Sequence, residues 1–485
     1  MRDDQEIDRI AGETRKHFRT AGQEHVFTFW DHLEAPARRR LLNQCEELEL
    51  ELLENLPVLD ARRAAAGMGE LLPAPCLRLE AEPENGTRAE ARERGEDLLA
   101  EGKVALLLVA GGRGSRLGWD GPKGCFPLAP LSGKSLFEIH AAKILRLRSI
   151  YGAPLPWYIM TSSAADAVTR DYFERPAHFG LPPGDIIFMR QASLPVLDER
   201  GKLILETPGS ILLSPNGHGG CYSALRDSGA LADALTREIE HLFYFQVDNP
   251  LVDLADPVFT GLHDLSRSDM SLKVLKKTGP GEKIGVVATR DGRPEVIEYS
   301  GLPPDKAELT EPGGELIFSF GSIGIHLLRR GFIEELLAAP SPLPLHPVKK
   351  QVLGIDEPGR ELELEATQFE SFVFDALPLT RRQLNIETRR EREFAPAKNL
   401  EGVDSVQTSR ALLLDEHRRW LSSAGITARG QLEIDPLAGI SADDLAEDLA
   451  PWKGKVFEGA LLISRADDGG LTVDENPAER GSADR

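Results

Sequence analysis

Cysteine is scarce in this sequence, which limits the ways in which the chain can be cross-linked. Only four cysteines occur among 485 residues, and no two of them have the CxxC spacing that is typical of zinc sites. They also lie too far apart to suggest a disulfide framework. A reducing compartment is therefore expected; the four residues are Cys45, Cys76, Cys125 and Cys221.

Long apolar runs are absent as well. No segment approaches 18 uninterrupted apolar residues, the length that would indicate a membrane-spanning helix. The first ten residues, MRDDQEIDRI, carry too many charges for a secretory signal. The sequence therefore predicts a cytoplasmic protein without a membrane partner.

Positive charge is in deficit. The chain has 57 Lys and Arg residues against 78 Asp and Glu residues, which gives a formal net charge of −21. Such a field repels polyanions, so no nucleic-acid partner is expected. An anionic ligand would have to be held locally, by backbone N–H groups and a few cations.

The N-terminal part of the chain has a helical pattern. Apolar residues recur at helical spacing between Leu41 and Leu56, and charged residues occupy the other face. We therefore expect a helical N-terminal region over residues 1–100. With 41% hydrophobic residues, the rest of the chain is long enough to bury a large core, in one or two further domains.

A short, continuously apolar run marks the start of the second region. Residues Lys103–Ala110 (KVALLLVA) are followed by two glycines, as expected of a strand that is buried on both faces of a parallel sheet. Similar bursts alternate with helix-like stretches, which is the pattern of βα units. The sequence predicts an α/β fold with a doubly wound, mixed and mostly parallel sheet over residues 101–385; the bursts are 157–160, 186–189, 242–247 and 272–274.

The remaining segments are expected to be peripheral. Shorter elements separated by proline and glycine predict a small C-terminal domain over residues 386–485, with a frayed tail after Gly469. Two stretches within the second region, 343–347 and 356–365, are rich in proline or charge and are expected to form exposed loops.

A glycine-rich loop follows the first buried strand, in the sequence LVAGGRGSRLG and then GPKG. Glycines let a backbone turn tightly and bring successive N–H groups to phosphate oxygens. Two cations, Arg116 and Lys123, then supply fixed charge, which suits a triphosphate whose negative charge grows at the departing pyrophosphate. The alternative is a tight turn with surface cations; the three glycines are Gly111, Gly112 and Gly114.

Two look-alike motifs fail. Completing the dinucleotide-binding GxGxxG pattern would need glycine at Leu117, and completing a Walker A loop before Ser132-Gly-Lys-Ser135 would need glycine at Leu128. A kinase that uses the second motif is therefore disfavoured, and residues 132–135 are expected to form a surface turn.

The loop and further motifs resemble those of the eukaryotic-type UDP-sugar pyrophosphorylases, most closely the UDP-N-acetylhexosamine pyrophosphorylases. The resemblance covers about four-fifths of the chain in order. It implies a fold of the nucleotide-diphospho-sugar transferase type and UTP as a substrate. The matching segments, besides 111–123, are 22–25 with 29–30, 160–162, 188–195, 217–220, 247–249, 296–300, 372–375 and 394–399.

The resemblance assigns roles in the nucleotide half of the site. Gln191 matches the glutamine that reads the uracil edge, a role suited to an amide because it offers both a donor and an acceptor. Asp248 matches the Mg²⁺ ligand; a carboxylate after a parallel strand points into the ligand crevice, although it could simply cap a turn. Lys398 resembles a lysine that reaches the phosphates, where a lysine would otherwise be solvated.

The sugar half departs from the family pattern. Gly285 and Glu298 match a glycine that faces the sugar and a glutamate that accepts hydrogen bonds from its hydroxyls; Glu298 could otherwise be an ordinary exposed strand residue. His218, after Gly217, stands where the acetylhexosamine branch usually has Asn, and its Gly-His-Gly setting resembles the glucose branch. The two flanking glycines predict a loop that faces a ligand, although a lone histidine could also be packed. Two further departures are Ser322 for Asn and Gln368 for Lys.

Together these observations predict a Mg²⁺-dependent uridylyltransferase that acts on UTP and a sugar 1-phosphate, without a covalent intermediate. N-acetylglucosamine 1-phosphate is favoured over glucose 1-phosphate or a broader range of sugars. A protein of another class, one that binds UDP-sugars without catalysis, is the main rival. The protein is expected to be a monomer or a weak homo-oligomer.

Overall fold

The computed structural model describes residues 2–48, 50, 69–83, 86–175, 177–299, 301–339, 343–356, 358–466, 469–475 and 477. These residues form two compact units. Unit 1 comprises residues 1–70, 191–220 and 340–375, and unit 2 comprises residues 71–190, 221–339 and 376–485. Whether the three consecutive regions expected from the sequence also fold separately stays a prediction.

Unit 1 joins N-terminal helices to short strands. Helices α1 (Arg2–Thr20) and α2 (Ala35–Glu47) confirm the expected helical N-terminus, whereas residues 51–56 of the helical pattern lie outside the described residues. Apolar side chains of these helices, Phe18 and Leu41 among them, share a core with Leu197. The other elements are η1 (Glu24–Phe27), η2 (Trp30–His32), β5 (Ser193–Pro195), β6 (Leu197–Asp198), β7 (Leu205–Thr207), β8 (Ser210–Ile211), β9 (Leu213–Pro215) and η7 (His218–Gly220).

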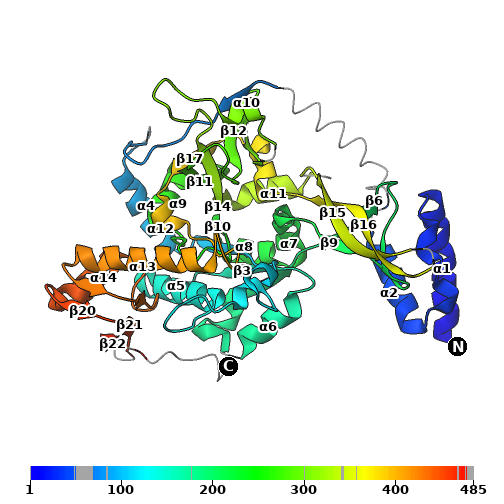
Figure 1. Cartoon of the computed structure of the whole chain (residues 1–485), viewed down its shortest axis with the longest axis horizontal. Coiled ribbons are helices and arrows are strands. Elements are labelled where there is room, and N and C mark those ends of the chain that lie inside the picture. Colours follow the sequence, from blue (N-terminus) through cyan, green and yellow to red (C-terminus); the bar gives the residue numbers. More distant parts are fainter. Residues whose placement is uncertain are drawn as a thin grey trace. The chain divides into compact units, whose positions relative to one another are not determined.

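Parts of both loops that were expected from the sequence are strands. Strands β15 (His346–Ile355) and β16 (Glu361–Glu370) pair antiparallel, so the loops expected at 343–347 and 356–365 are wrong where they overlap these strands (Figure 1). The run of charged residues suggested an exposed loop. In fact Leu362 and Leu364 alternate with glutamates, and this period of two residues is typical of a strand.

Unit 2 is built on a ten-stranded mixed sheet, which confirms the predicted fold class. Four neighbouring strands are parallel in the order β10-β2-β3-β4, and β11 also pairs parallel with β17. Antiparallel pairing, more extensive than expected, begins at β14. The parallel strands are almost wholly buried, as their apolar sequences require. The strands are β1 (Leu71–Pro73), β2 (Val104–Val109), β3 (Trp157–Thr161), β4 (Ile186–Arg190), β10 (His241–Gln246), β11 (Met270–Lys276), β12 (Val286–Arg290), β13 (Arg293–Ile297), β14 (Phe320–Arg329) and β17 (Gln383–Glu387).

The strand order creates a switch point. From β2 the chain moves to β3 and β4 on one side and later returns to β10 on the other side. Ligands of open α/β sheets bind beyond the carboxyl ends of the strands at such a point. The loop after β2 and the turn after β10 therefore mark the expected site.

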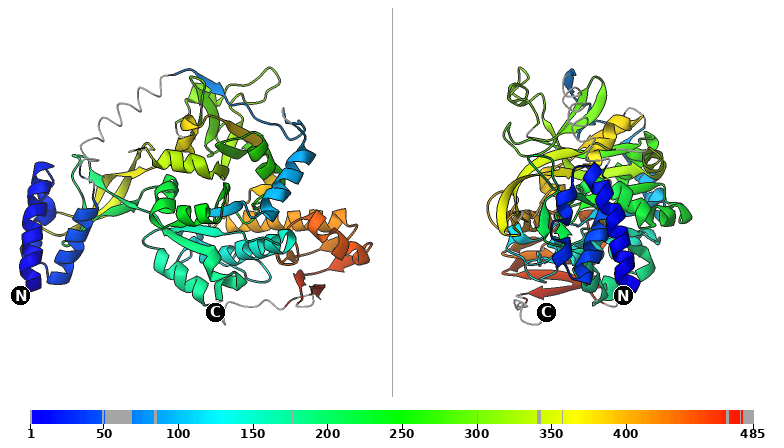
Figure 2. Two further views of the ribbon diagram at one scale, coloured as in Figure 1. Left: turned by 180° about the vertical axis from the view of Figure 1, so that it is seen from behind. Right: turned by 90° about the vertical axis from the view of Figure 1, so that its right-hand side faces the viewer.

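Helices cover both faces of this sheet (Figures 1 and 2). On one face, α4 (Arg88–Ala100), α5 (Leu136–Tyr151) and α9 (Pro257–Leu265) share a core with Leu106 and Phe243. On the other face, the hydroxyl of Tyr158 donates to Asp233 of α8 (Ala230–Thr236). The remaining helices of this part are η3 (Ser115–Leu117), η4 (Lys123–Cys125), α6 (Asp166–Glu174), η5 (Ala177–Gly180), η6 (Pro183–Asp185), α7 (Cys221–Asp227), α10 (Pro304–Ala307), α11 (Arg330–Leu337), η8 (Val373–Leu379) and α12 (Arg390–Glu393).

The C-terminal residues form a small layer with its own core within unit 2. Helices α13 (Val406–Ser423) and α14 (Ala442–Leu449) lie beside α5, and Arg146 of α5 donates to Asp444 of α14 at 2.9 Å (Figure 1). The other elements are β18 (Thr427–Arg429), β19 (Leu432–Ile434), η9 (Ala450–Trp452), β20 (Val456–Glu458), β21 (Leu461–Arg465) and β22 (Leu471–Glu475). Strand β22 pairs with β21, so fraying directly after Gly469 is wrong, and residues 478–485 lie outside the described part.

The stretch Ser132–Ser135 is not a surface turn. Ser135 is 1% exposed and forms a capping box with Glu138 at the start of α5. The ammonium of Lys134 contacts Asp435 at 2.5 Å. The Gly-Lys-Ser sequence therefore has a structural role, in which Ser135 caps α5 and Lys134 pairs with Asp435.

Among the described residues, no helix is long and apolar enough to cross a membrane.

Candidate active site

The glycine-rich loop leaves the carboxyl end of β2 and folds back on itself. The N–H of Gly114 donates to the carbonyl of Gly121 at 2.9 Å, and the N–H of Lys123 donates to the carbonyl of Gly112 at 3.0 Å. Ser162, which follows β3, donates its hydroxyl to the carbonyl of Gly111 at 2.8 Å. The loop is thus anchored to two neighbouring strands and brings Lys123 back to the end of β2.

The glycines of this loop have different structural reasons. A Cβ on Gly114 would lie 2.8 Å from Cβ of Trp119, so glycine is needed there for packing. A Cβ on Gly112 would meet only Cε of Lys123, at 3.9 Å, and Gly112 is exposed. Gly112 is therefore the position whose backbone a ligand can approach.

Lys123 and Asp248 meet at the switch point. The ammonium of Lys123 lies 3.0 Å from Oδ2 of Asp248, and the two side chains are 13% and 10% exposed. Burial alone would raise the pKa of Asp248, but the charges of Lys123 and Lys398 outweigh it and hold that pKa below its usual value. Asp248 is therefore a carboxylate at neutral pH, the form that binds Mg²⁺ together with phosphate oxygens.

The segment that carries Lys398 is joined to the Asp248 turn. The N–H of Ala397 donates to the carbonyl of Asp248 at 2.8 Å, and the N–H of Ala395 donates to Oδ1 of Asn249 at 3.0 Å. Lys398 itself is half-buried and contacts Asp404 at 3.3 Å. The structure therefore groups Lys123, Asp248 and Lys398, as the sequence predicts.

Arg116 has a different setting. It is exposed, and among the described residues its guanidinium has no hydrogen-bond or ion-pair partner. Of the two cations that were expected to hold a fixed position, Lys123 is held by its ion pair with Asp248, whereas Arg116 extends from the surface. Arg116 is joined to the site through its backbone, since its carbonyl accepts from the N–H of Leu400 at 2.9 Å.

Three residues assigned to the sugar lie together in unit 2. The N–H of Ser322, on β14, donates to the carbonyl of Gly285 at 2.8 Å. A Cβ on Gly285 would lie 2.8 Å from Val296 and 3.7 Å from Oε1 of Glu298. Gly285, Glu298 and Ser322 thus form one polar group, although their role toward a sugar stays a prediction.

The residues assigned to the base and to the rest of the sugar belong to unit 1. Gln191 is 7% exposed and donates through Nε2 to the carbonyl of Gly217 at 2.5 Å. His218 follows Gly217, so these three residues lie together. Gln368, on β16, accepts a hydrogen bond from Lys350 at 2.9 Å. Its amide is therefore engaged within unit 1.

His218 packs against neighbouring residues, and glycine is needed on either side of it because the backbone there lies close to other atoms. Its Nδ1 accepts from the N–H of Val373 at 3.1 Å, and its ring centroid lies 5.2 Å from that of Phe372. A Cβ on Gly217 would lie 2.3 Å from the carbonyl oxygen of Ser371, and one on Gly219 2.7 Å from the nitrogen of Phe372. The flanking glycines thus do not by themselves indicate a ligand-facing loop. Burial lowers the pKa of His218 to about 4, so the ring is neutral.

Two residues that the sequence does not predict support Asp248. His140 of α5 is fully buried, and its Nε2 contacts the carbonyl of Val247 at 3.0 Å. Burial lowers the pKa of His140 to about 3, so its neutral ring can donate this bond. Asn249 donates to the carbonyl of Glu393 at 2.7 Å. Only the position of Asn249, next to Asp248, could have signalled such a role.

Another group of potential metal ligands lies at the opposite end of β10. In the described part of the chain, Glu240, His241 and Asp264 place one ligand atom each within 4.8 Å of one another. The group excludes Asp248, and Arg94 contacts Asp264 at 2.7 Å, which supplies positive charge where a metal ion would bind. Asp248 therefore remains the better candidate for the predicted Mg²⁺ ligand.

The chain as a whole is similar to known proteins. The model of the family of UTP–glucose-1-phosphate uridylyltransferase matches residues 82–432. The chain is 34% identical to UDP-N-acetylhexosamine pyrophosphorylase-like protein 1 of Homo sapiens, over 93% of this chain and 96% of that protein. It is 32% identical to the UDP-N-acetylglucosamine pyrophosphorylase of Saccharomyces cerevisiae, over 93% and 99% of the two chains.

A solved structure also resembles this fold. The UDP-N-acetylglucosamine pyrophosphorylase of Trypanosoma brucei, solved with an inhibitor, aligns with a TM-score of 0.79. The alignment covers 94% of this chain and 98% of that chain at 24% identity. This likeness concerns the fold, whereas the sequence relatives carry the closer relationship.

Proposed function

The chain belongs to the UTP–glucose-1-phosphate uridylyltransferase family, and from that premise we propose that it joins UTP to N-acetylglucosamine 1-phosphate, releasing UDP-N-acetylglucosamine and pyrophosphate. It is a nucleotidyltransferase of the UDP-sugar pyrophosphorylase type. The observation that carries the proposal for the site is the Lys123–Asp248 contact at the end of β2 and β10, 3.0 Å long.

The reaction needs positioning and charge neutralisation rather than a protein nucleophile. A phosphate oxygen of the sugar 1-phosphate attacks the α-phosphorus of UTP, and the bond from that phosphorus to the pyrophosphate oxygen breaks. Lys123 and Lys398 neutralise charge on the phosphates as it develops, and the exposed guanidinium of Arg116 joins them. The backbone at Gly111 and Gly112 supplies N–H groups along the triphosphate, whereas Gly114, whose N–H donates to the carbonyl of Gly121, shapes the loop.

Asp248 is the residue that would hold Mg²⁺. Its carboxylate is ionised and nearly buried beside Lys123, and a single carboxylate suffices where phosphates and waters complete the shell. A bound Mg²⁺ would supply positive charge to the triphosphate oxygens. His140 and Asn249 hold the turn that presents this carboxylate.

The base and the sugar are assigned to two sets of residues. Gln191 keeps one amide hydrogen and its carbonyl oxygen for the uracil edge while it donates to Gly217. Glu298 accepts hydrogen bonds from sugar hydroxyls, beside Gly285 and Ser322. His218 and Gln368, which belong to unit 1, are the other residues assigned to the sugar, and both are neutral polar groups.

The choice of sugar rests on the named relatives. The human and yeast proteins are named for N-acetylhexosamine and N-acetylglucosamine, whereas the family model is named for glucose 1-phosphate. Glucose 1-phosphate is therefore the second candidate, and the neutral His218 in place of Asn favours it. We further propose a cytoplasmic monomer or weak homo-oligomer that acts without nucleic acid or membrane.

One experiment tests both the activity and the sugar. Purified protein is incubated with UTP, Mg²⁺ and a panel of sugar 1-phosphates, and the products are identified by mass spectrometry while pyrophosphate is measured. UDP-N-acetylglucosamine is expected as the main product. If UDP-glucose is the only product, glucose 1-phosphate replaces N-acetylglucosamine 1-phosphate as the proposed substrate. If calorimetry detects UTP binding but no pyrophosphate is released, a non-catalytic UDP-sugar-binding protein is favoured instead.

A further inference from the structure

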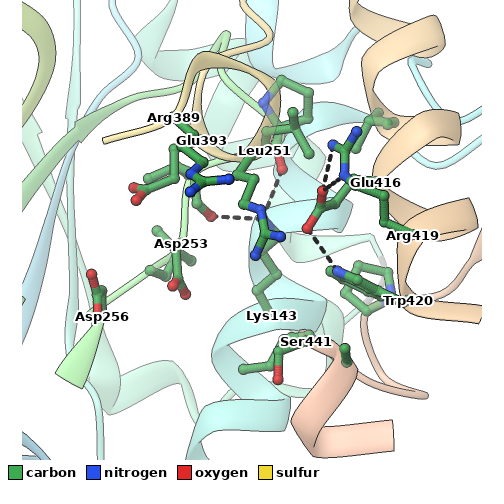
Figure 3. Close-up of a pocket in the computed structure, with 18 of the residues that line it drawn as sticks. Lys143, Leu251, Asp253, Asp256, Arg389, Glu393, Glu416, Arg419, Trp420 and Ser441 are labelled. Carbon is green, nitrogen blue, oxygen red and sulfur yellow. Dashed lines mark hydrogen bonds and ion pairs between the residues drawn. The ribbon is translucent and has the colours of Figure 1, made fainter. Parts of the chain in front are cut away.

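A large cavity lies within unit 2, away from the glycine-rich loop. Its volume is about 870 Å³, and it lies among α5, the 250–256 turn, the 386–393 segment, α13 and the start of α14. Figure 3 shows Asp253, Asp256, Glu393 and Arg389 on one wall and Trp420 on another. A cavity of this size suits a metabolite rather than a macromolecule.

The charge of the lining differs from that of the whole protein. The described residues that line the cavity include nine Lys and Arg side chains against seven Asp and Glu side chains, in a chain whose net charge is −21. Local positive charge within an acidic protein concentrates anions at that place. The ligand of this cavity should therefore be an anion.

Several of these cations lack a carboxylate partner among the described residues. Lys143 donates to the carbonyls of Pro250 and Val252, both at 2.7 Å. Arg410 likewise donates to backbone carbonyls, and the guanidinium of Arg392 has no hydrogen-bond or ion-pair partner in the described part of the chain. Carbonyl oxygens satisfy hydrogen bonds without cancelling charge, so this positive charge remains available to a ligand.

Arg389 is also available, and the chemistry of the rim suits phosphate. In the part of the chain that the structure describes, the guanidinium of Arg389 pairs with Glu80 alone, at 3.5 Å, and the two side chains are 48% and 89% exposed, so a ligand can replace that contact. Guanidinium groups such as those of Arg389 and Arg392 match the geometry of phosphate oxygens. Trp420 and Leu251 offer apolar surface for the remainder of a small molecule.

The cavity and the candidate active site share two chain segments. The first segment runs from Asp248 to Asp253, and the second runs from Arg389 to Lys398; each has one end in the site and the other end in the cavity. They are tied together by Asn249, which donates to the carbonyl of Glu393 at 2.7 Å. The side chain of Asn249 thus gives the two segments a direct connection between the cavity and the Asp248 turn.

We propose that this cavity is a second ligand site, which binds a small phosphate ester through Arg389 and Arg392 and is coupled to the Asp248 turn. Of the two claims, only the coupling rests on the proposed uridylyltransferase function. Binding can be measured whether or not the protein is active.

Binding is tested by calorimetry on the full chain with inorganic phosphate, glucose 6-phosphate and citrate as probes. UDP-N-acetylglucosamine is present in excess to fill the active site. Glucose 6-phosphate is expected to bind under these conditions. No heat with either phosphate probe, or binding of citrate alone, would overturn the phosphate-ester site.

Two variants locate the site. The double variant Arg389→Gln/Arg392→Gln, which changes only exposed side chains, should raise the Kd for glucose 6-phosphate at least tenfold. The matched control Arg381→Gln, which removes an exposed arginine outside the cavity, should leave Kd unchanged. At pH 8, Asp253→Asn should lower Kd because it removes a negative charge from the cavity. Equal Kd values in the double variant and the control would place the ligand elsewhere.

The coupling has its own readout. Saturating glucose 6-phosphate should change the KM for UTP at least twofold in the native protein, and this change should disappear in the double variant. By reciprocity, UTP should shift the Kd for glucose 6-phosphate by the same factor by which glucose 6-phosphate shifts the Kd for UTP. Binding that leaves the KM for UTP unaltered would refute the coupling, whereas failure to form any UDP-sugar would refute the proposed function instead.

Discussion

Two buried lysines of unit 2 illustrate how similar ion pairs serve different ends. Lys123 lies on a loop, contacts one carboxylate and is 13% exposed. Lys273 lies on β11, is 2% exposed and contacts Asp256 at 2.7 Å and Glu393 at 2.5 Å. The first pair lies beside the glycine-rich loop, whereas in the second the lysine is enclosed by two carboxylates on the wall of the cavity. Burial alone would lower the pKa of Lys273, but the carboxylates around it outweigh burial and hold that pKa above its usual value.

Replacing the enclosed lysine should have the largest effect. Lys273→Met keeps the volume but leaves two carboxylates without their cation, so the free energy of unfolding should fall by about 3–5 kcal/mol. Urea denaturation followed by circular dichroism measures this change. The control Lys276→Met lies on the same strand, 40% exposed, and should stay within about 0.5 kcal/mol. Similar losses in both variants would show that the buried cluster has no special role.

Replacing the loop lysine should affect turnover more than folding. Lys123→Ala is expected to lower kcat by about 100- to 1000-fold, because it removes charge from the phosphates in the transition state. The fold should persist, since Lys398 still compensates the charge of Asp248. Pyrophosphate release measures the activity, and Arg113→Ala serves as a control, because Arg113 is an exposed loop residue that pairs with Asp120. Turnover retained in Lys123→Ala would remove this residue from the mechanism.

The difference between the two lysines also shows what sequence can predict. Lys123 was identified because a buried strand, a glycine loop and a lysine follow one another along the chain. Lys273 lies inside a strand, and its partners come from distant segments, so no local pattern reveals them. Lys143 and Asp253, which line the cavity, were missed for the same reason.

The sequence predicts the strands of this protein better than it predicts side-chain contacts. The predicted strand at 103–110 is β2, because only burial on both faces explains a continuous apolar run. The glycines beside His218 predict a ligand-facing loop from the sequence, yet in the structure they allow close approach to Ser371 and Phe372. A sequence shows that a glycine is present, but not which atom approaches it.

Two glycines test this point with smaller effects. Gly219→Ala would place a Cβ 2.7 Å from the backbone nitrogen of Phe372, so it should cost about 1–3 kcal/mol of stability. Gly112→Ala meets nothing closer than 3.9 Å, so stability should hold. Its methyl group should instead hinder the triphosphate and raise the KM for UTP about tenfold, or about 1.4 kcal/mol. Thermal melts and UTP titrations separate the outcomes; a stable Gly219→Ala, or an unchanged KM in Gly112→Ala, would contradict them.

The smallest predicted effect is a pH dependence of stability at Asp253, whose neighbours include Asp256, Glu393 and Lys273. Burial, followed by repulsion from Asp256, raises the pKa of Asp253 to about 7, above its usual value of 3.8. A carboxyl whose pKa is raised by folding contributes stability that is present below the unfolded pKa and is lost as pH rises through the folded pKa. Asp253→Asn cannot lose a proton, so its Tm should exceed that of the native protein at pH 8 and approach it at pH 5. A Tm difference that does not change between these two pH values would mean that Asp253 is ionised throughout, and that Lys273 and Lys143 compensate it fully.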